Sequence, residues 1–181
     1  MQMTRREFLA SAGAAILAPA VPAAANGGKA DQTRRPNIIL CMTDDQGWGD
    51  TGYNGHPHLK TPNLDEIAAS GVRFNRFYAA CAVCSPTRGS CLTGRHPYRY
   101  GIFSANVGHM PAREHTLAEL LREHGYTTGH FGKWHLGTLT KDVLDANRGG
   151  QPRHERHYSP PWKNGFDVCF STESKVPTWD P

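Results

Sequence analysis

The stretch Cys81–Arg95, CAVCSPTRGSCLTGR, is the one around which the rest of this 181-residue chain is organised. Pro86 suits the first turn of a helix, where its missing N–H costs nothing. We therefore expect Cys84 at or just before a helix N-terminus, where free N–H groups and the positive end of the helix dipole favour an anion. Arg88, four residues further on, returns to the same helix face. The stretch predicts a reactive thiol in a site built for an oxyanion.

Two structural roles for these thiols are the alternatives. A disulfide between Cys81 and Cys91 remains open, but it would explain neither the proline nor the arginine. A zinc site on Cys81 and Cys84 needs a second ligand pair at matching spacing, and the other two cysteines of the chain stand alone.

Length and composition favour a single globular domain. The chain is long enough to bury one sizeable core, and 38% of its residues are hydrophobic. Its net charge is +4 and it has no run of lysine or arginine, which argues against a nucleic-acid partner. A basic pocket for a small acidic substrate agrees better with this mild charge.

The first 25 residues have the pattern of a targeting signal. Arg5 and Arg6 precede a short apolar run and an alanine-rich segment that ends at Ala25, which resembles a bacterial twin-arginine signal. The apolar run is about half of the ~20 residues that span a bilayer, so we favour cleavage near Ala25 over a membrane anchor. This predicts the twin-arginine export machinery as a partner and a periplasmic or extracellular location. Residues 26–35 are predicted to be a polar linker.

The next motif is a pair of acids after an apolar run. Residues 36–42, PNIILCM, have the composition of a strand buried on both faces, and Asp44 and Asp45 follow it. Open α/β sheets bind their ligands at the carboxyl ends of such strands. Adjacent carboxylates repel unless a cation holds them, so we interpret this pair as metal ligands. A solvated turn rich in Asp and Gly is the alternative.

Helix and strand patterns alternate along the remaining chain. A helix is predicted at 61–71, because this segment has a cap residue, a proline in the first turn and a terminal glycine. A second helix is predicted to begin with a capping box at Thr116 and to end at Gly125, with Leu117, Leu120 and Leu121 on its buried face. Strands are predicted at 72–78 and 126–131, and a turn entering a further strand at 164–170. This alternation predicts an α/β fold with a mostly parallel sheet flanked by helices.

A second cationic motif, Gly132–Gly137, follows the strand predicted at 126–131. Its sequence is GKWHLG, and Lys133 and His135 lie two residues apart, so they project to one side of an extended backbone. A lone lysine or histidine here would more often be a surface residue or a histidine with a structural role in the core.

Three elements of this sequence together resemble the sulfatase family of the alkaline phosphatase superfamily. They are the stretch Cys81–Arg95, the acid pair Asp44 and Asp45, and the motif Gly132–Gly137. The family signature C-x-P-[ST]-R, followed by L-T-G-R, is matched from Cys84 onward, and G-K-W-H-x-G is a second family motif. The resemblance implies an alkaline-phosphatase-like fold and arylsulfatase-like hydrolysis of sulfate esters, with a sulfated small molecule or polysaccharide as substrate. Residues 36–181 would then be the N-terminal part of a sulfatase catalytic domain that the sequence leaves incomplete.

The resemblance also implies a role for each site residue. A formylglycine-generating enzyme would oxidise Cys84 to formylglycine, and Asp44, Asp45 and the modified Cys84 would bind calcium. Arg88 would hold the modified residue and the neighbouring acid in register, Lys133 would neutralise the substrate sulfate, and His135 would act on the hydroxyl of the modified side chain.

Two other functions stay open. A phosphonate or phosphoester hydrolase of the same superfamily faces a similar charge problem at phosphorus. A catalytically inactive fragment is the other, because calcium takes about 6–8 oxygen ligands and this sequence supplies too few.

Overall fold

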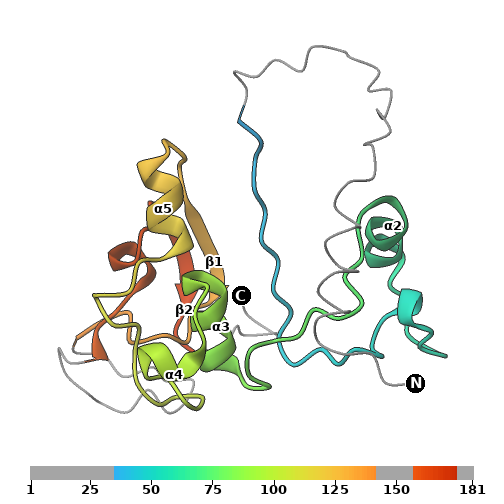
Figure 1. Cartoon of the computed structure of the whole chain (residues 1–181), viewed down its shortest axis with the longest axis horizontal. Coiled ribbons are helices and arrows are strands. Elements are labelled where there is room, and N and C mark those ends of the chain that lie inside the picture. Colours follow the sequence, from blue (N-terminus) through green and yellow to red (C-terminus); the bar gives the residue numbers. More distant parts are fainter. Residues whose placement is uncertain (1–34, 142–156, 175–181) are drawn as a thin grey trace, which may run out of the picture. The chain divides into compact units, whose positions relative to one another are not determined.

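The computed structural model describes residues 35–141 and 157–174 (Figure 1). The chain divides into two units, Met1–Cys41 and Met42–Pro181, and every candidate site residue belongs to the second. The predicted signal peptide, residues 1–25, and nearly all of the predicted linker lie outside the described residues. The boundaries expected for these segments therefore stay predictions.

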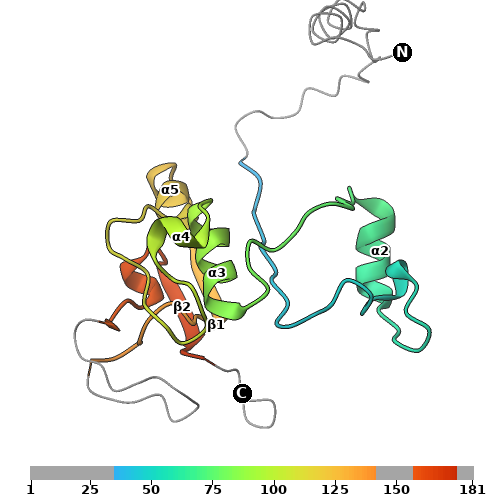
Figure 2. The same ribbon diagram turned by 60° about the horizontal axis from the view of Figure 1, so that its bottom comes forward.

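Two parallel strands confirm the expected α/β character. Strand β1 (Gly129–Lys133) pairs with β2 (Val168–Thr172) in a register that runs from Gly129 opposite Val168 to Lys133 opposite Thr172. Figures 1 and 2 show the pair side by side, with α3 and α5 nearby. Both strands extend two residues beyond the segments predicted at 126–131 and 164–170. Lys133, which lies beyond the end of the strand predicted at 126–131, is the last residue of β1.

The helices follow the local signals in the sequence closely. Thr61 is the N-cap of α2, with proline in its first turn, and Gly71 is its C-cap. None of the helices within 35–141 and 157–174 combines the length and the apolar character needed to cross a bilayer. The helical elements in chain order are η2 (Gly52–Asn54), α2 (Pro62–Ser70), α3 (Cys84–Thr93), α4 (Pro97–Tyr100), α5 (Leu117–Glu123) and η3 (Pro161–Lys163).

The predicted capping box opens α5. The Thr116 hydroxyl accepts from the Glu119 backbone N–H at 3.2 Å, and the Glu119 carboxylate accepts from the Thr116 N–H at 2.7 Å. Both N–H groups belong to the helix start, where no backbone carbonyl can accept from them. The helix ends at Glu123 with His124 as its C-cap, and the predicted terminal residue Gly125 follows with a left-handed φ of 77°.

The leucine face predicted for α5 is wrong. Leu117 and Leu120 are 36% and 43% exposed, Leu121 is half-buried, and Ala118 is the buried residue of the helix. The cause is a backbone turn packed directly on this part of the helix, since a Cβ on Gly165 would lie 2.4 Å from the Glu119 nitrogen. The helix therefore meets this turn through Glu119 and the backbone of Ala118, not through its leucines.

A small aromatic and aliphatic core supports the site. Its buried members are Tyr100, Ile102, Met110, Trp134 and Leu136, with Leu92, Leu139 and Phe166 packed against them. The Trp134 indole donates to the Ser159 carbonyl at 2.7 Å, so its one polar group is satisfied. The Met110 N–H donates to the Leu136 carbonyl at 2.7 Å. This bond joins the loop after α4 to the segment after β1.

Two predicted strands are wrong. Residues 36–42 and 72–78 are not strands, and they are exposed, with Ile39 at 91%, Val72 at 83% and Phe77 at 84%. A strand requires a partner that takes up its backbone N–H and C=O groups, and apolar composition cannot supply one. Within the described part of the chain, neither run pairs with β1 or β2.

Candidate active site

Cys84 is the first residue of α3, as predicted. Val83 precedes it as an extended N-cap, and no side chain caps the free N–H groups of this helix end. The Tyr100 hydroxyl donates to the Pro86 carbonyl and lies 2.9 Å from the Ser90 hydroxyl, which fastens the start of α3 to the core. All five cysteines of the chain are described and free, so Cys81 forms no disulfide with Cys91.

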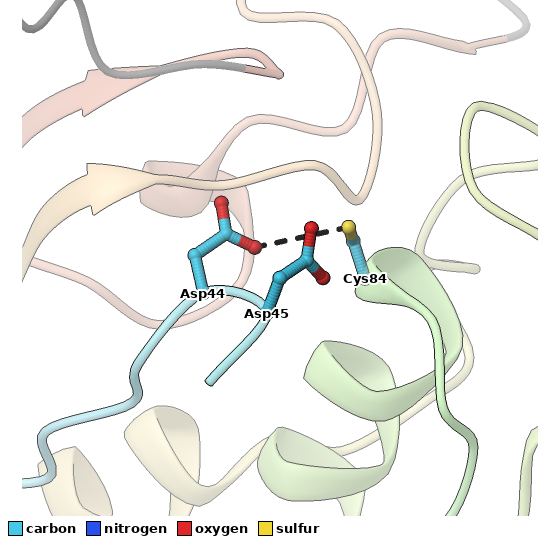
Figure 3. Close-up of side chains that lie close together, drawn as sticks. All are labelled: Asp44, Asp45 and Cys84. Carbon is cyan, nitrogen blue, oxygen red and sulfur yellow. Dashed lines mark hydrogen bonds between the residues drawn. The ribbon is translucent and has the colours of Figure 1, made fainter. Parts of the chain in front are cut away.

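The two predicted metal ligands lie beside this thiol. The Cys84 sulfur is 3.8 Å from Oδ1 of Asp44, and one ligand atom from each of Asp44, Asp45 and Cys84 lies within 4.8 Å of the others (Figure 3). Neighbouring side chains of an extended chain point in opposite directions. Asp45 instead has a left-handed backbone, with φ of 56°, and this turn lets both carboxylates approach the sulfur.

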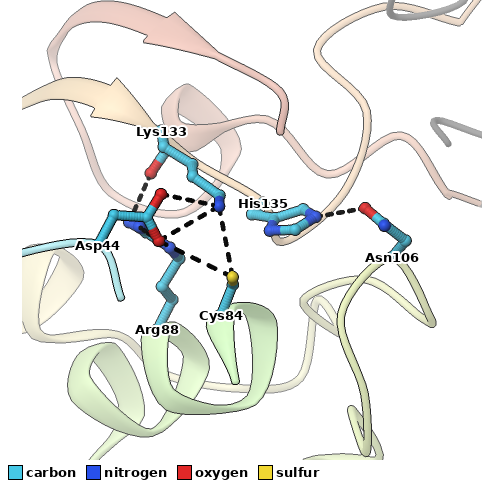
Figure 4. Close-up of polar contacts among 6 residues, drawn as sticks. All are labelled: Asp44, Cys84, Arg88, Asn106, Lys133 and His135. Carbon is cyan, nitrogen blue, oxygen red and sulfur yellow. Dashed lines mark hydrogen bonds and ion pairs between the residues drawn. The ribbon is translucent and has the colours of Figure 1, made fainter. Parts of the chain in front are cut away.

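Lys133 brings a positive charge from the end of β1 to the same point. Its Nζ is 3.0 Å and 3.4 Å from the two carboxylate oxygens of Asp44, and 3.3 Å from the Cys84 sulfur (Figure 4). The lysine side chain is only 11% exposed, whereas that of Asp44 is 49% exposed. The charge is therefore held in place by burial of the lysine stem.

Arg88 connects the helix, the strand and the acid. Its Nη1 donates to the Lys133 carbonyl at 2.9 Å, and its Nη2 lies 3.5 Å from Oδ1 of Asp44. Burial opposes the charge of Asp44, but the hydrogen bonds and charges of Lys133 and Arg88 outweigh it and hold the pKa of this carboxyl below its ordinary value. The carboxylate is thus ionised at neutral pH.

His135 contacts a residue that the sequence did not indicate. The prediction that Lys133 and His135 project to one side requires an extended backbone, but β1 ends at Lys133 and His135 has a φ of 57°. Its Nε2 is hydrogen-bonded to the side-chain oxygen of Asn106 (Figure 4). The only signal for Asn106 in the sequence is the tolerance of asparagine for a left-handed backbone, which it adopts here with φ of 60°. That signal alone points to a turn rather than to a site.

Left-handed backbone is concentrated around this cluster. Among the described residues other than glycine, positive φ occurs only at Asp45, Asn106 and His135. Such conformations cost about 1–3 kcal/mol each and persist where the surrounding structure imposes them, commonly at functional sites. All three side chains belong to the groups in Figures 3 and 4.

The donor set fits a hard divalent cation, though incompletely. Two carboxylates are the ligands that calcium and magnesium prefer, whereas the thiol of Cys84 is a soft ligand. An oxygen in place of that sulfur would make the set uniformly hard. The described residues bring three donors together, at most half of the roughly six to eight that calcium takes.

Comparison with known proteins identifies the family. A model of the sulfatase family matches residues 36–175. The chain belongs to the sulfatase family. It is 41% identical over 164 residues to N-acetylgalactosamine-6-sulfatase of Canis lupus familiaris, covering 84% of this chain and 28% of that protein. It is 49% identical over 109 residues to arylsulfatase A of Homo sapiens, covering 58% of this chain and 22% of that protein.

Solved structures show the same sulfatase fold. Ps i-CgsB has a TM-score of 0.61 and 35% identity, covering 78% of this chain and 29% of that one. BT4656, in complex with its substrate D-glucosamine-2-N,6-O-disulfate, has a TM-score of 0.57 and 27% identity, covering 81% of this chain and 35% of that one. This sulfatase chain therefore spans between 22% and 35% of the length of these relatives. Sulfatases generally use a formylglycine and a divalent metal.

Proposed function

We propose that the protein hydrolyses sulfate esters and that Cys84, oxidised to formylglycine, supplies the nucleophile. The observation that carries the proposal is the position of the Cys84 sulfur, at the start of α3 and 3.3 Å from Lys133 Nζ. A thiol at a free helix N-terminus beside the Lys133 ammonium is placed where an anionic group is stabilised. One hydroxyl of the aldehyde hydrate can attack sulfur and displace the alcohol of the ester. When the other hydroxyl then loses its proton, the aldehyde C=O re-forms and the C–O bond to sulfate breaks.

The side chains around Cys84 then have distinct tasks. Lys133 neutralises the sulfate group and lowers the cost of the charge that develops on its oxygens. Arg88 orients Lys133 and Asp44 through its contacts at 2.9 and 3.5 Å. His135 holds or moves the proton of the hydroxyl that expels sulfate.

Calcium is the proposed cation, with Asp44, Asp45 and the modified Cys84 among its ligands. Two observations support this choice: the carboxylates of Asp44 and Asp45 are hard oxygen ligands, and the chain belongs to the sulfatase family. When bound, the ion supplies positive charge opposite the sulfate oxygens. The three donors brought together here require further oxygen ligands to complete a calcium site.

A sulfated carbohydrate is the proposed substrate. Two relatives support it, because one is an N-acetylgalactosamine-6-sulfatase and another binds D-glucosamine-2-N,6-O-disulfate as its substrate. Ps i-CgsB also binds a carbohydrate, k-i-k-neocarrahexaose, with a TM-score of 0.60 and 35% identity to this chain.

Peptide mass spectrometry tests the modification. The native protein is produced with a formylglycine-generating enzyme and digested with trypsin, which releases Cys81 and Cys84 in one peptide, residues 77–88, and Cys91 in another, residues 89–95. We expect the aldehyde mass only on the first peptide, and fragmentation should assign it to Cys84. An aldehyde at Cys81, or none at all, contradicts the proposal.

Turnover of two ester classes tests the reaction. Release of sulfate from an aryl sulfate should exceed hydrolysis of the matching aryl phosphonate, and Cys84→Ala should abolish it while Cys81→Ala retains it. Preference for the phosphonate would assign the protein to the other hydrolase class of the superfamily. No turnover of either ester by the fully modified, calcium-loaded protein would favour the inactive alternative.

Export by the twin-arginine machinery is proposed from the sequence of residues 1–25. Replacing Arg5 and Arg6 by lysine should keep the protein in the cytoplasm of its host, as cell fractionation and immunoblotting would show. Unchanged export of this double variant would rule out the twin-arginine route.

A further inference from the structure

We propose that Asn106 is a positioning residue that fixes the tautomer of His135, a role that rests on the proposed function. The two residues are 29 positions apart, and their contact joins the carboxamide oxygen of Asn106 to Nε2 of the imidazole (Figure 4). An amide oxygen only accepts hydrogen bonds, so Nε2 must donate. A neutral imidazole carries one N–H, and the basic lone pair is therefore on Nδ1.

The core holds both residues in place. Ile102 and Met110, on the two sides of Asn106, are fully buried, as are Trp134 and Leu136 on the two sides of His135. The four side chains belong to one cluster, and the Met110 N–H donates to the Leu136 carbonyl at 2.7 Å. The loop and the strand end are thus fastened to one another independently of the Asn106 side chain.

The backbone supports the same assignment. Asn106 and His135 both have left-handed φ, of 60° and 57°. Asparagine tolerates this conformation better than most residues, and glycine adopts it without cost. A substitution by glycine therefore removes the carboxamide while keeping the turn, which separates the hydrogen bond from the conformation of the loop.

The tautomer determines which histidine nitrogen can exchange a proton. With Nε2 engaged by Asn106, proton transfer to or from the hydroxyl of the modified Cys84 is left to Nδ1. In histidines generally, the hydrogen bond that one ring nitrogen makes to a neighbouring residue determines which nitrogen carries the proton. Loss of Asn106 would divide the ring between two tautomers and orientations, of which only one is productive.

Nitrogen-15 NMR of the imidazole measures the tautomer directly. In the native protein at a pH where His135 is neutral, we expect the Nε2–H form. Asn106→Gly should give a mixture of both forms, and Asn106→Asp, which keeps an acceptor oxygen, should restore the Nε2–H form. Val107→Ala, in the same loop, is the control and should leave the spectrum unchanged. An Nδ1–H form in the parent, or an unchanged spectrum in Asn106→Gly, would overturn the proposal.

Kinetics then connect the tautomer with turnover. Asn106→Gly should lower kcat about tenfold with little change in KM, which corresponds to about 1.4 kcal/mol. In Asn106→Asp the added charge favours the imidazolium, so the acidic limb of the kcat profile should move to higher pH. A kcat equal to that of the parent in Asn106→Gly would refute the positioning role. The NMR measurement needs no substrate, so it remains decisive if the protein hydrolyses no sulfate ester, a result that would refute only the proposed function.

Discussion

Replacement of Lys133 by methionine separates its electrostatic role in turnover from its contribution to stability. Methionine keeps most of the buried stem and removes the ammonium group, which lies 3.0 Å from Oδ2 of Asp44. Two unit charges at this distance in water attract by about 1.4 kcal/mol. Because the Asp44 side chain is 49% exposed, screening should leave about 1 kcal/mol or less. That loss corresponds to a fall in Tm of about 2–4 °C for a chain of this size.

The expected effect on turnover is much larger. A preorganised cation that faces the developing charge of a transition state is worth about 10²–10³ in rate. The assay is sulfate release from an aryl sulfate by the formylglycine-bearing native protein, with Tm measured on the same samples. Lys163→Met removes a lysine that stacks on Tyr158 outside the cluster and should leave turnover unchanged. If Lys133→Met turned over as fast as the parent, the assignment of Lys133 to the sulfate would be wrong.

Three further predictions follow from other contacts. Calcium should raise the Tm of the native protein in calorimetry and should do so less in Asp45→Asn; a parent that is insensitive to calcium would remove the metal role. Burial, with a smaller effect of a nearby arginine, lowers the pKa of His130 from 6.5 to about 4. Between pH 4 and pH 6.5 the unfolded chain therefore binds more protons than the folded protein. The free energy of unfolding should rise with pH across this window and level off above it. Urea unfolding at several pH values should show a weaker dependence in His130→Gln. Gly89→Ala would place a Cβ 2.8 Å from the ring of Tyr100. Overpacking of about 1–3 kcal/mol, offset by about 1 kcal/mol of helix propensity, should give a net loss in urea unfolding, whereas Gly49→Ala, with nothing within 4 Å, should be neutral.

Features set by neighbouring residues could be predicted from the sequence. Thr61 and Gly71 mark the ends of α2, the capping box marks the start of α5, and Pro86 indicates that Cys84 opens a helix. Each of these signals acts within one or two helical turns. The cluster of Asp44, Cys84, Arg88 and Lys133 was likewise expected, because family motifs place these residues in one pocket.

Features set by distant partners could not be predicted. The apolar runs at 36–42 and 72–78 have strand composition, but no strand ladder forms on them in the described chain. The buried face of α5 depends on Gly165, which lies more than forty residues from the helix in sequence. Asn106 was missed for the same reason, since its partner His135 is 29 residues away.

The left-handed backbone at Asp45, Asn106 and His135 affects how mutational data on this protein should be interpreted. In a saturation library, β-branched and other bulky residues at these positions would be selected against by backbone geometry alone, before any chemistry is tested. Depletion there cannot by itself distinguish a ligand from a turn. Glycine is the informative substitution, because it is the one residue that keeps the conformation and deletes the functional group. If this site were grafted onto another scaffold, the left-handed backbone conformation at these three positions would have to be reproduced along with the side chains.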